Sequence, residues 1–159
     1  MITRHGAEVL DELRPLYLGL RDHHAAAAPH FGEIRDDDGA WARRIARYRR
    51  AIADEDAFVL VARDDDGNAL GYAFTHLADG MPGWTQPERL GVVDTLTVDA
   101  AQRGNGIGKA LLDRVYAELA PLGIDTVALD VIASNDGARR FYEREGFTER
   151  TVTYWARRP

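Results

Sequence analysis

Three glycines between residues 104 and 108 separate a strand-like segment from a helix-like one. The block LTVDAAQRGNGIGKALL, residues 96–112, has Gly104, Gly106 and Gly108 near its centre. Glycines allow backbone N–H groups to approach a phosphate closely, and the N-terminus of a following helix adds a partial positive charge. The block therefore predicts an anion site, and a pyrophosphate is the group that suits it.

The spacing of these glycines excludes two common nucleotide-binding loops. The dinucleotide pattern G-x-G-x-x-G, counted from Gly104, needs a third glycine where Lys109 stands. The nucleotide P-loop needs glycine first and Ser or Thr after the lysine, where the chain has Arg103 and Ala110. The pattern that fits is R/Q-x-x-G-x-G/A, beginning at Arg103.

On this motif the chain resembles the GNAT superfamily of acetyl-CoA-dependent N-acetyltransferases. A second block, LDVIASNDGARRFYEREGF at residues 129–147, is similar to that family's other signature, which is asparagine, alanine and then F/L-Y-E-x-x-G-F. One departure is Ala100, where many members have proline. The resemblance covers the chain from about residue 57 onward. It implies a GNAT fold of the α/β (α+β) class, with a single mixed, twisted sheet of six to seven strands flanked by about four helices.

The resemblance also implies that acetyl-CoA binds as cosubstrate and that no metal is required. In the family the strand at 90–98 bulges and splays from the strand at 126–133, and the pantetheine arm enters that gap. A bulge leaves backbone groups unpaired, and one such N–H is expected to polarise the thioester carbonyl. The implied cofactor-binding residues are Leu96, Thr97, Val98, Arg103, Gly104, Asn105, Gly106, Ile107, Gly108, Lys109, Asn135 and Tyr142.

Acetyl transfer to an amine needs a deprotonated amine, direct attack on the thioester and a proton for the departing thiolate. By resemblance, Tyr142 is the general acid, and the alternative is a core tyrosine paired with Phe141. Asp130 and Asp94 are the two candidates for the base, although a base acting through water would leave neither essential. His76 either reaches the acceptor pocket or is a partly buried histidine.

Hydrophobic periodicity predicts the elements that must position these residues. Spacings of three and four residues predict four helices, at 7–24 with an interruption near Pro15, at 39–54, at 109–123, and at 135–147 with Asn135 as N-cap. Apolar runs rich in strand formers predict strands at 2–5, 57–64, 69–78, 90–98, 126–133 and 148–156.

Length and composition limit the function further. The 159 residues suit a single domain over 1–159, with no division into two. The absence of cysteine excludes disulfides and thiolate chemistry, and the start MITRHGAEVL lacks a leader segment, so we expect a cytoplasmic protein that does not enter membranes. A net charge of -6 argues against nucleic-acid binding, and the arginines of WARRIARYRR (41–50) are interpreted as a solvated face.

The acceptor is expected to be a primary amine of a small molecule or peptide. The first two helices and the loop around Met81 to Trp84 are expected to bind it, and the acidic balance mildly favours a cationic acceptor. Acetylation of protein N-termini or lysines stays open. A non-catalytic acyl-CoA-binding regulatory module is the alternative function, and the resemblance is compatible with a homodimer.

Overall fold

The computed structural model describes residues 1–54 and 56–156, so the last three residues of the expected domain lie outside it. One sheet has the strand order β1-β2-β3-β4-β5. Strands β1 to β4 pair antiparallel, whereas β5 runs parallel to β4, so the sheet is mixed as expected. The strands are β1 (Ile2–His5), β2 (Phe58–Arg63), β3 (Ala69–Asp79), β4 (Arg89–Val98) and β5 (Val127–Ala128).

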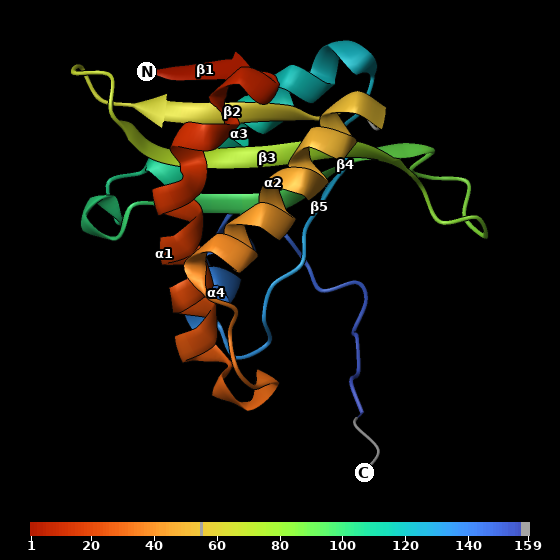
Figure 1. Ribbon diagram of the computed structural model, residues 1–159. Helices are drawn as coiled ribbons and strands as arrows, with labels where there is room; N and C mark the ends of the chain where they lie inside the picture. Colours follow the sequence, from red (N-terminus) through yellow and green to blue (C-terminus); the bar gives the residue numbers. More distant parts are fainter. Residues whose placement is uncertain (55, 157–159) are drawn as a thin grey trace.

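Helices cover both faces of this sheet (Figure 1). Helices α1 and α2 lie on one face and α3 lies on the other. The four α-helices of the described residues are α1 (Arg14–Ala27), α2 (Asp37–Asp54), α3 (Ile107–Leu119) and α4 (Asp136–Arg144). None of the helices described is long and apolar enough to cross a membrane. The expected number of helices is confirmed.

The first helical segment changes type just before Pro15. Residues Ala7–Leu13 form a 3-10 helix, and α1 begins at Arg14 with Pro15 in its first turn. Proline has no backbone N–H, and the N–H groups of a first turn have no partner within the helix. The interruption expected near Pro15 is therefore confirmed.

Each face of the sheet carries its own apolar core. On the α1 and α2 face, the ring of Tyr48 stacks on that of Phe74 with their centroids 3.8 Å apart. On the α3 face, Leu111, Val115 and Leu119 are fully buried against the sheet. Period-two alternation along β3 sends neighbouring side chains to different cores.

The described residues contain five strands, which corrects the expectation of six to seven. The segment 148–156 was expected to be the last strand, but it forms no strand pairing with any described residue. In Figure 1 it leads away from the sheet. Val152, Tyr154 and Trp155 within it are largely exposed to solvent. A sequence rich in strand formers becomes a strand only where a neighbouring edge is available.

The shortness of β5 removes the edge that this segment would need. The strand expected over 126–133 is paired only at Val127–Ala128. Beyond it, the Ser134 hydroxyl donates a hydrogen bond to the carbonyl of Ala27 at 2.6 Å. The chain after β5 is therefore attached to the end of α1 and leaves the sheet.

Gly91 of β4 provides a test of the packing between the sheet and α3. A Cβ at this position would lie 2.5 Å from Cδ1 of Leu119, which is fully buried. Because a packed side chain must move, we expect Gly91→Ala to lower the free energy of unfolding by about 1–3 kcal/mol.

Gly19→Ala in α1 is the control for Gly91→Ala. A Cβ at Gly19 has no heavy atom within 4 Å, and alanine favours a helix over glycine by about 1 kcal/mol. Urea denaturation of the two variants should therefore give changes of opposite sign. Two changes of the same sign would contradict the packing described for β4 and α3.

Candidate active site

Strand β4 contains a bulge at Asp94. Phe74 of β3 pairs with Thr95, whereas the next residue of β3, Thr75, pairs with Val93, and Asp94 is left as an extra residue. An extra residue resets the alternation of side chains along a strand. Asp94 and Thr95 therefore both reach the face covered by α2, and the bulge expected within 90–98 is confirmed.

Two consecutive residues of α2 bind these two residues of β4. Nη2 of Arg47 donates to both carboxylate oxygens of Asp94, at 2.8 and 2.9 Å. The hydroxyl of Tyr48 donates to Oγ1 of Thr95 at 2.6 Å and lies 3.1 Å from the hydroxyl of Tyr72. Burial raises the pKa of both tyrosines, so these hydroxyls stay neutral and act as hydrogen-bonding groups.

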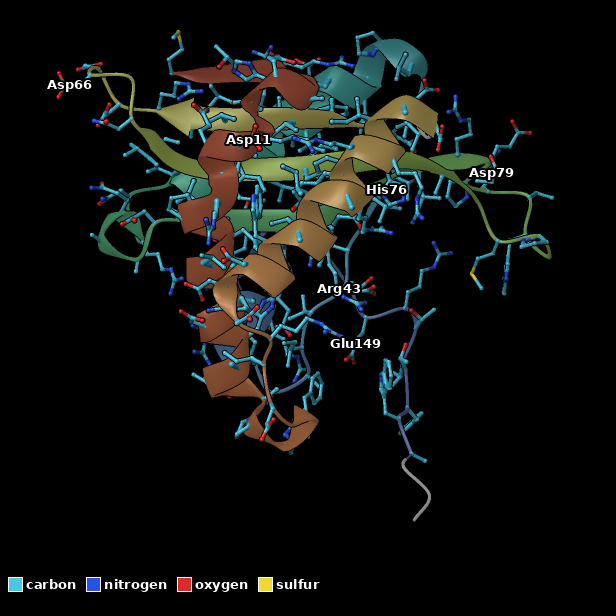
Figure 2. All side chains as sticks on the ribbon, viewed as in Figure 1. Asp11, Arg43, Asp66, His76, Asp79 and Glu149 are labelled. Atoms are coloured by element: carbon cyan, nitrogen blue, oxygen red, sulfur yellow. The ribbon has the colours of Figure 1, made fainter. Side chains whose placement is uncertain are left out.

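His76 completes this polar cluster from β3. Its Nδ1 lies 3.0 Å from Oδ2 of Asp94, and both side chains are only 13% exposed. Figure 2 shows His76 on the sheet beneath α2. The carboxylate of Asp94, a candidate base in the sequence, thus contacts both Arg47 and His76.

Beyond the bulge, β4 and β5 separate. Their pairing is limited to Gly91 with Val127 and Val92 with Ala128. Residues 93–98 of β4 have no strand partner on the β5 side within the described part of the chain. The expected splay is confirmed, and the strand segment that includes Leu96, Thr97 and Val98 borders it.

The three glycines of the loop differ in their conformation. Gly104 and Gly106 have φ angles of 83° and 79°, and a Cβ on either would have no heavy atom within 4 Å. Glycine is needed there for its backbone freedom and leaves the space above the loop open. Gly108 has no positive φ, and a Cβ on it would lie 3.5 Å from Cζ of Phe141 in α4.

Gly106 is the N-cap of α3, and no side chain caps this helix. The first N–H groups of a helix have no partner within the helix, and they carry a partial positive charge. Ile107 and Gly108 begin the helix, and Ile107 also packs at the edge of the α3 core. The start of α3 therefore presents backbone donors without a side-chain competitor.

Two polar side chains of the loop bind other protein groups. Nε of Arg103 donates to the carbonyl of Val98 at 3.4 Å, and Nδ2 of Asn105 donates to Oε1 of Gln102 at 3.4 Å. Arg103 is therefore held across the end of β4. The glycine loop follows β4 along the chain through the short 3-10 turn Ala100–Gln102.

Lys109 follows the glycines on the first turn of α3. Its Nζ donates to Asp113 at 2.8 Å and lies 3.6 Å from Oε2 of Glu145 at the end of α4. The hydrogen bond with Asp113 raises the pKa of Lys109. This cation is already partly balanced by carboxylates, which weakens it as a ligand for a phosphate.

The second sequence block forms α4 and the aromatic cluster behind it. Asn135 is a buried N-cap whose Oδ1 accepts a hydrogen bond from the N–H of Ala138 at 3.1 Å, as expected. The ring centroid of Tyr142 lies 5.0 Å from that of Phe141 and 5.4 Å from that of Phe147. Burial raises the pKa of Tyr142 to about 12. Its hydroxyl has no hydrogen-bond partner among the described residues.

Asp130, the other candidate base, is placed quite differently from Asp94. It lies after β5, is exposed, and makes no hydrogen bond or ion pair with any described residue. The structure does not bring the two carboxylates into contact. In the described part of the chain, no group of three or more His, Cys, Asp or Glu residues is arranged to hold a metal ion.

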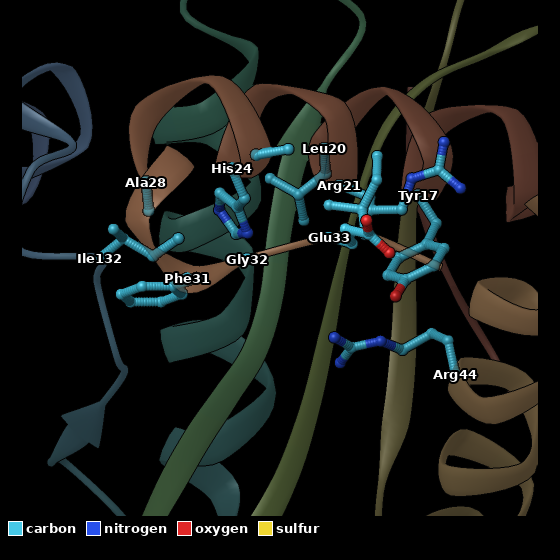
Figure 3. A pocket seen from close by; sticks show the side chains of 12 residues that line it. Tyr17, Leu20, Arg21, His24, Ala28, Phe31, Gly32, Glu33, Arg44 and Ile132 are labelled. Atoms are coloured by element: carbon cyan, nitrogen blue, oxygen red, sulfur yellow. The ribbon is translucent and has the colours of Figure 1, made fainter. Parts of the chain in front are cut away.

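A cavity of about 190 Å³ lies between α1, α2 and the segment that joins them (Figure 3). Ile132, from the chain that leaves the sheet after β5, completes its wall. The lining residues are Tyr17, Leu20, Arg21, His24, Ala25, Ala28, Phe31, Gly32, Glu33, Ile34, Arg44 and Ile132. The two helices that are expected to bind the acceptor both line this cavity, whereas the loop around Met81 to Trp84 does not.

Two arginines of α2 with inward contacts were missed by the interpretation of 41–50 as a solvated face. Arg44 lines the cavity and Arg47 binds Asp94, whereas Arg43 is exposed as expected. Both missed arginines flank the apolar stripe of α2. Long side chains in such a position bury their aliphatic stems, and their charged ends reach either solvent or a polar group of the protein. Their helical spacing next to Trp41 and Tyr48 was the available signal.

A mixed sheet whose bulged β4 separates from β5, followed by an open glycine turn into a helix, is the architecture of an acetyltransferase fold. The sequence model of the acetyltransferase (GNAT) family matches residues 18–147. The chain belongs to this family.

The chain is 36% identical over 129 residues to a mycothiol acetyltransferase of Propionibacterium freudenreichii, and the match covers 79% of this chain and 38% of the relative. The chain thus spans less than half the length of the curated relatives that it matches. A tetramutant of the BH1408 protein from Bacillus halodurans shares the fold with a TM-score of 0.82, 21% identity and 99% coverage of both chains. The AAC(6')-Iy structure, in complex with the bisubstrate analog CoA-S-monomethyl-acetylneamine, has a TM-score of 0.69 and 20% identity, covering 100% of this chain and 98% of the other.

The ion pair between Arg47 and Asp94 leads to a prediction about stability. Asp94→Asn keeps the shape of the side chain but removes the charge that Arg47 and His76 contact. Because hydrogen bonds to charged groups contribute roughly 1.5–3 kcal/mol, we expect the free energy of unfolding to fall by about that amount. Asp130→Asn, on the exposed segment, should change it by less than about 0.5 kcal/mol. Urea denaturation at neutral pH compares the two, and equal losses would contradict the role given to Asp94.

Proposed function

We propose that this chain is an acetyl-CoA-dependent N-acetyltransferase that passes the acetyl group directly to a primary amine of a small molecule or peptide. The observation that carries the proposal is the unpaired edge of β4 beyond the bulge, which leads along the chain into the glycine loop and the uncapped start of α3. The similarity to mycothiol acetyltransferases and to a structure that holds a CoA analog supports it.

The pyrophosphate of the cofactor binds to backbone N–H groups between Gly104 and Lys109. Gly104 and Gly106 leave the space above the loop empty, and the partial charge of α3 favours an anion there. Because Lys109 is already bonded to Asp113, backbone groups supply most of this interaction. Arg103 and Asn105 shape the loop around the phosphates.

The pantetheine arm lies along the open edge of β4. Backbone groups of Leu96, Thr97 and Val98 hydrogen-bond its amides in place of the missing strand. One of these N–H groups also donates to the thioester carbonyl and stabilises the negative charge that develops there. Asn135, at the start of α4, contacts the same arm.

The reaction forms a C–N bond and breaks a C–S bond. The nitrogen of the neutral amine attacks the thioester carbon, the thiolate of CoA departs, and the new amide loses one proton. A cysteine-like thiol has a pKa of about 8.5, well below the value of about 12 for Tyr142. Complete proton transfer from the tyrosine is therefore unfavourable, and we assign its hydroxyl the role of a hydrogen-bond donor that stabilises the departing sulfur before the thiolate takes a proton.

The two carboxylates have different roles in this proposal. Asp94 holds Arg47 and His76 in place, since its oxygens already contact both. The proton of the amine leaves through water, and Asp130, which is exposed, is the carboxylate that accepts it. A water-mediated route requires no direct contact between Asp130 and the amine.

Binding of acetyl-CoA tests the proposal at the glycine loop. At a ligand concentration about 100 times the dissociation constant, the added stability is about 2.7 kcal/mol, which raises the melting midpoint by roughly 5–10 °C. We expect this shift with acetyl-CoA and not with NADH or ATP. Gly106→Ala should abolish it because a Cβ at a positive φ distorts the loop.

Gly67→Ala is the matched control for Gly106→Ala. Gly67 also has a positive φ, 88°, and free space around it, but it lies in the turn between β2 and β3. Both variants should lose similar stability, and only Gly106→Ala should lose the shift with acetyl-CoA. A larger shift with ATP or NADH would overturn the assignment of the cofactor.

Tyr142→Phe tests the chemical step. We expect a roughly 100-fold loss of kcat with little change in the affinity for acetyl-CoA, because the lost hydrogen bond forms mainly in the transition state. Release of free thiol across a panel of amines measures the rate, and Tyr154→Phe, at an exposed position, is the control. An unchanged kcat would show that Tyr142 has a purely structural role.

Tight acetyl-CoA binding with no thiol release from any acceptor would favour the non-catalytic acyl-CoA-binding module.

A further inference from the structure

Two walls of the cavity between α1 and α2 relate it to the region where β4 and β5 separate. Its wall includes Ile132, which belongs to the chain that departs from the sheet after β5. Its opposite wall includes Arg44, one helical turn before Tyr48, whose hydroxyl binds Thr95 next to the bulge. A molecule in this cavity therefore lies close to the part of β4 where the thioester is proposed to sit.

The two arginines of the cavity have different surroundings. Arg21 forms ion pairs with Asp22 at 2.6 Å and with Asp37 at 2.8 Å. Arg44 has no carboxylate within ion-pair distance among the described residues. Its guanidinium carbon lies 4.9 Å from the ring centre of Tyr17 and 5.5 Å from that of Tyr48.

Arg44 is thus a partly buried cation that contacts aromatic faces and lacks an ionic partner in the described structure. Burying a charge is costly unless an opposite charge or hydrogen-bond acceptors compensate for it. Stacking on tyrosine supplies only part of this compensation. The guanidinium also hydrogen-bonds to the side chain of Tyr17, and its remaining donors are available for a carboxylate, which a planar guanidinium binds through two parallel hydrogen bonds.

Two further titratable side chains of the cavity, His24 and Glu33, are less suited than Arg44 to bind a carboxylate. His24 has a pKa lowered by burial and by the nearby His23 and Arg44, so it is neutral at neutral pH. Glu33 also lines the cavity (Figure 3), is exposed and makes no ion pair with any described residue. Aromatic and aliphatic side chains form much of the remaining wall, including Phe31 and Leu20.

We propose that Arg44 binds a carboxylate of the acceptor, which makes the preferred acceptor a small amine that also carries a carboxylate and an apolar or aromatic group. The proposal rests on the proposed acetyltransferase function and names the class of its acceptor. A cavity of about 190 Å³ is small for a ligand site and fits a group of amino-acid size better than an extended polycation.

A pair of probes tests the carboxylate site. N-acetyl-L-phenylalanine and N-acetyl-L-phenylalaninamide resemble a reaction product and differ only in the negative charge. Calorimetric titration of the CoA-loaded wild-type protein should show at least about tenfold tighter binding of the carboxylate, as expected for a charge-assisted hydrogen bond. Arg44→Met should bring the two affinities together.

Arg43→Met is the matched control, because Arg43 is the preceding residue of α2 and is exposed. It should retain the preference of the wild-type protein. Arg44→Lys, which keeps the charge but not the planar donor pair, should retain part of the preference and serves if Arg44→Met does not fold. A wild-type protein that binds the two probes equally, prefers the amide or binds neither would overturn the proposal.

The outcome for acetyl-CoA is read separately. Acetyl-CoA could fail to stabilise the protein while the unliganded protein still prefers the carboxylate probe. That result would contradict the acetyltransferase function and support the carboxylate site. If acetyl-CoA binds and the probe preference is missing, the carboxylate site falls and the proposed function stands.

Discussion

The bulge at Asp94 is the constraint on which the arrangement of the site depends. In a regular strand, Asp94 and Thr95 would point to opposite faces of the sheet. The extra residue places both on the α2 face, where Arg47 and Tyr48 bind them. Four polar groups thereby fix the position of α2 relative to β4. Since α2 also forms a wall of the cavity, the bulge helps to fix the position of that wall.

The separation of β4 from β5 affects both β4 and the chain that follows β5. It leaves residues 93–98 without a strand neighbour on the β5 side, and it releases the chain after β5 toward α1. The hydrogen bond from Ser134 to Ala27 then holds that chain beside the cavity. A single interruption of pairing thus leaves one backbone edge of β4 without a strand and adds a wall to the cavity between α1 and α2.

Local sequence patterns predicted the helices and the central strands because their apolar spacing reports directly on burial. The bulge has no such signal: VVDTLTV reads as an ordinary strand, and only the resemblance to a family indicated it. The segment 148–156 has strong strand formers but no available edge, so composition alone predicted it incorrectly. Arg44 and Arg47 were assigned to solvent because charge was considered without their position beside the apolar stripe of α2.

Overall charge and local charge lead to different expectations for the acceptor. The net charge of -6 favours a cation in the surrounding solvent, yet charges separated by more than about 8–10 Å are largely screened at physiological ionic strength. A carboxylate about 4 Å from Arg44 would gain roughly 4 kcal/mol of attraction at an effective dielectric constant of 20, before desolvation is subtracted. In the proposed site, acidic groups on the distant surface therefore influence the rate of encounter, whereas Arg44 and its aromatic neighbours select the molecule that is retained.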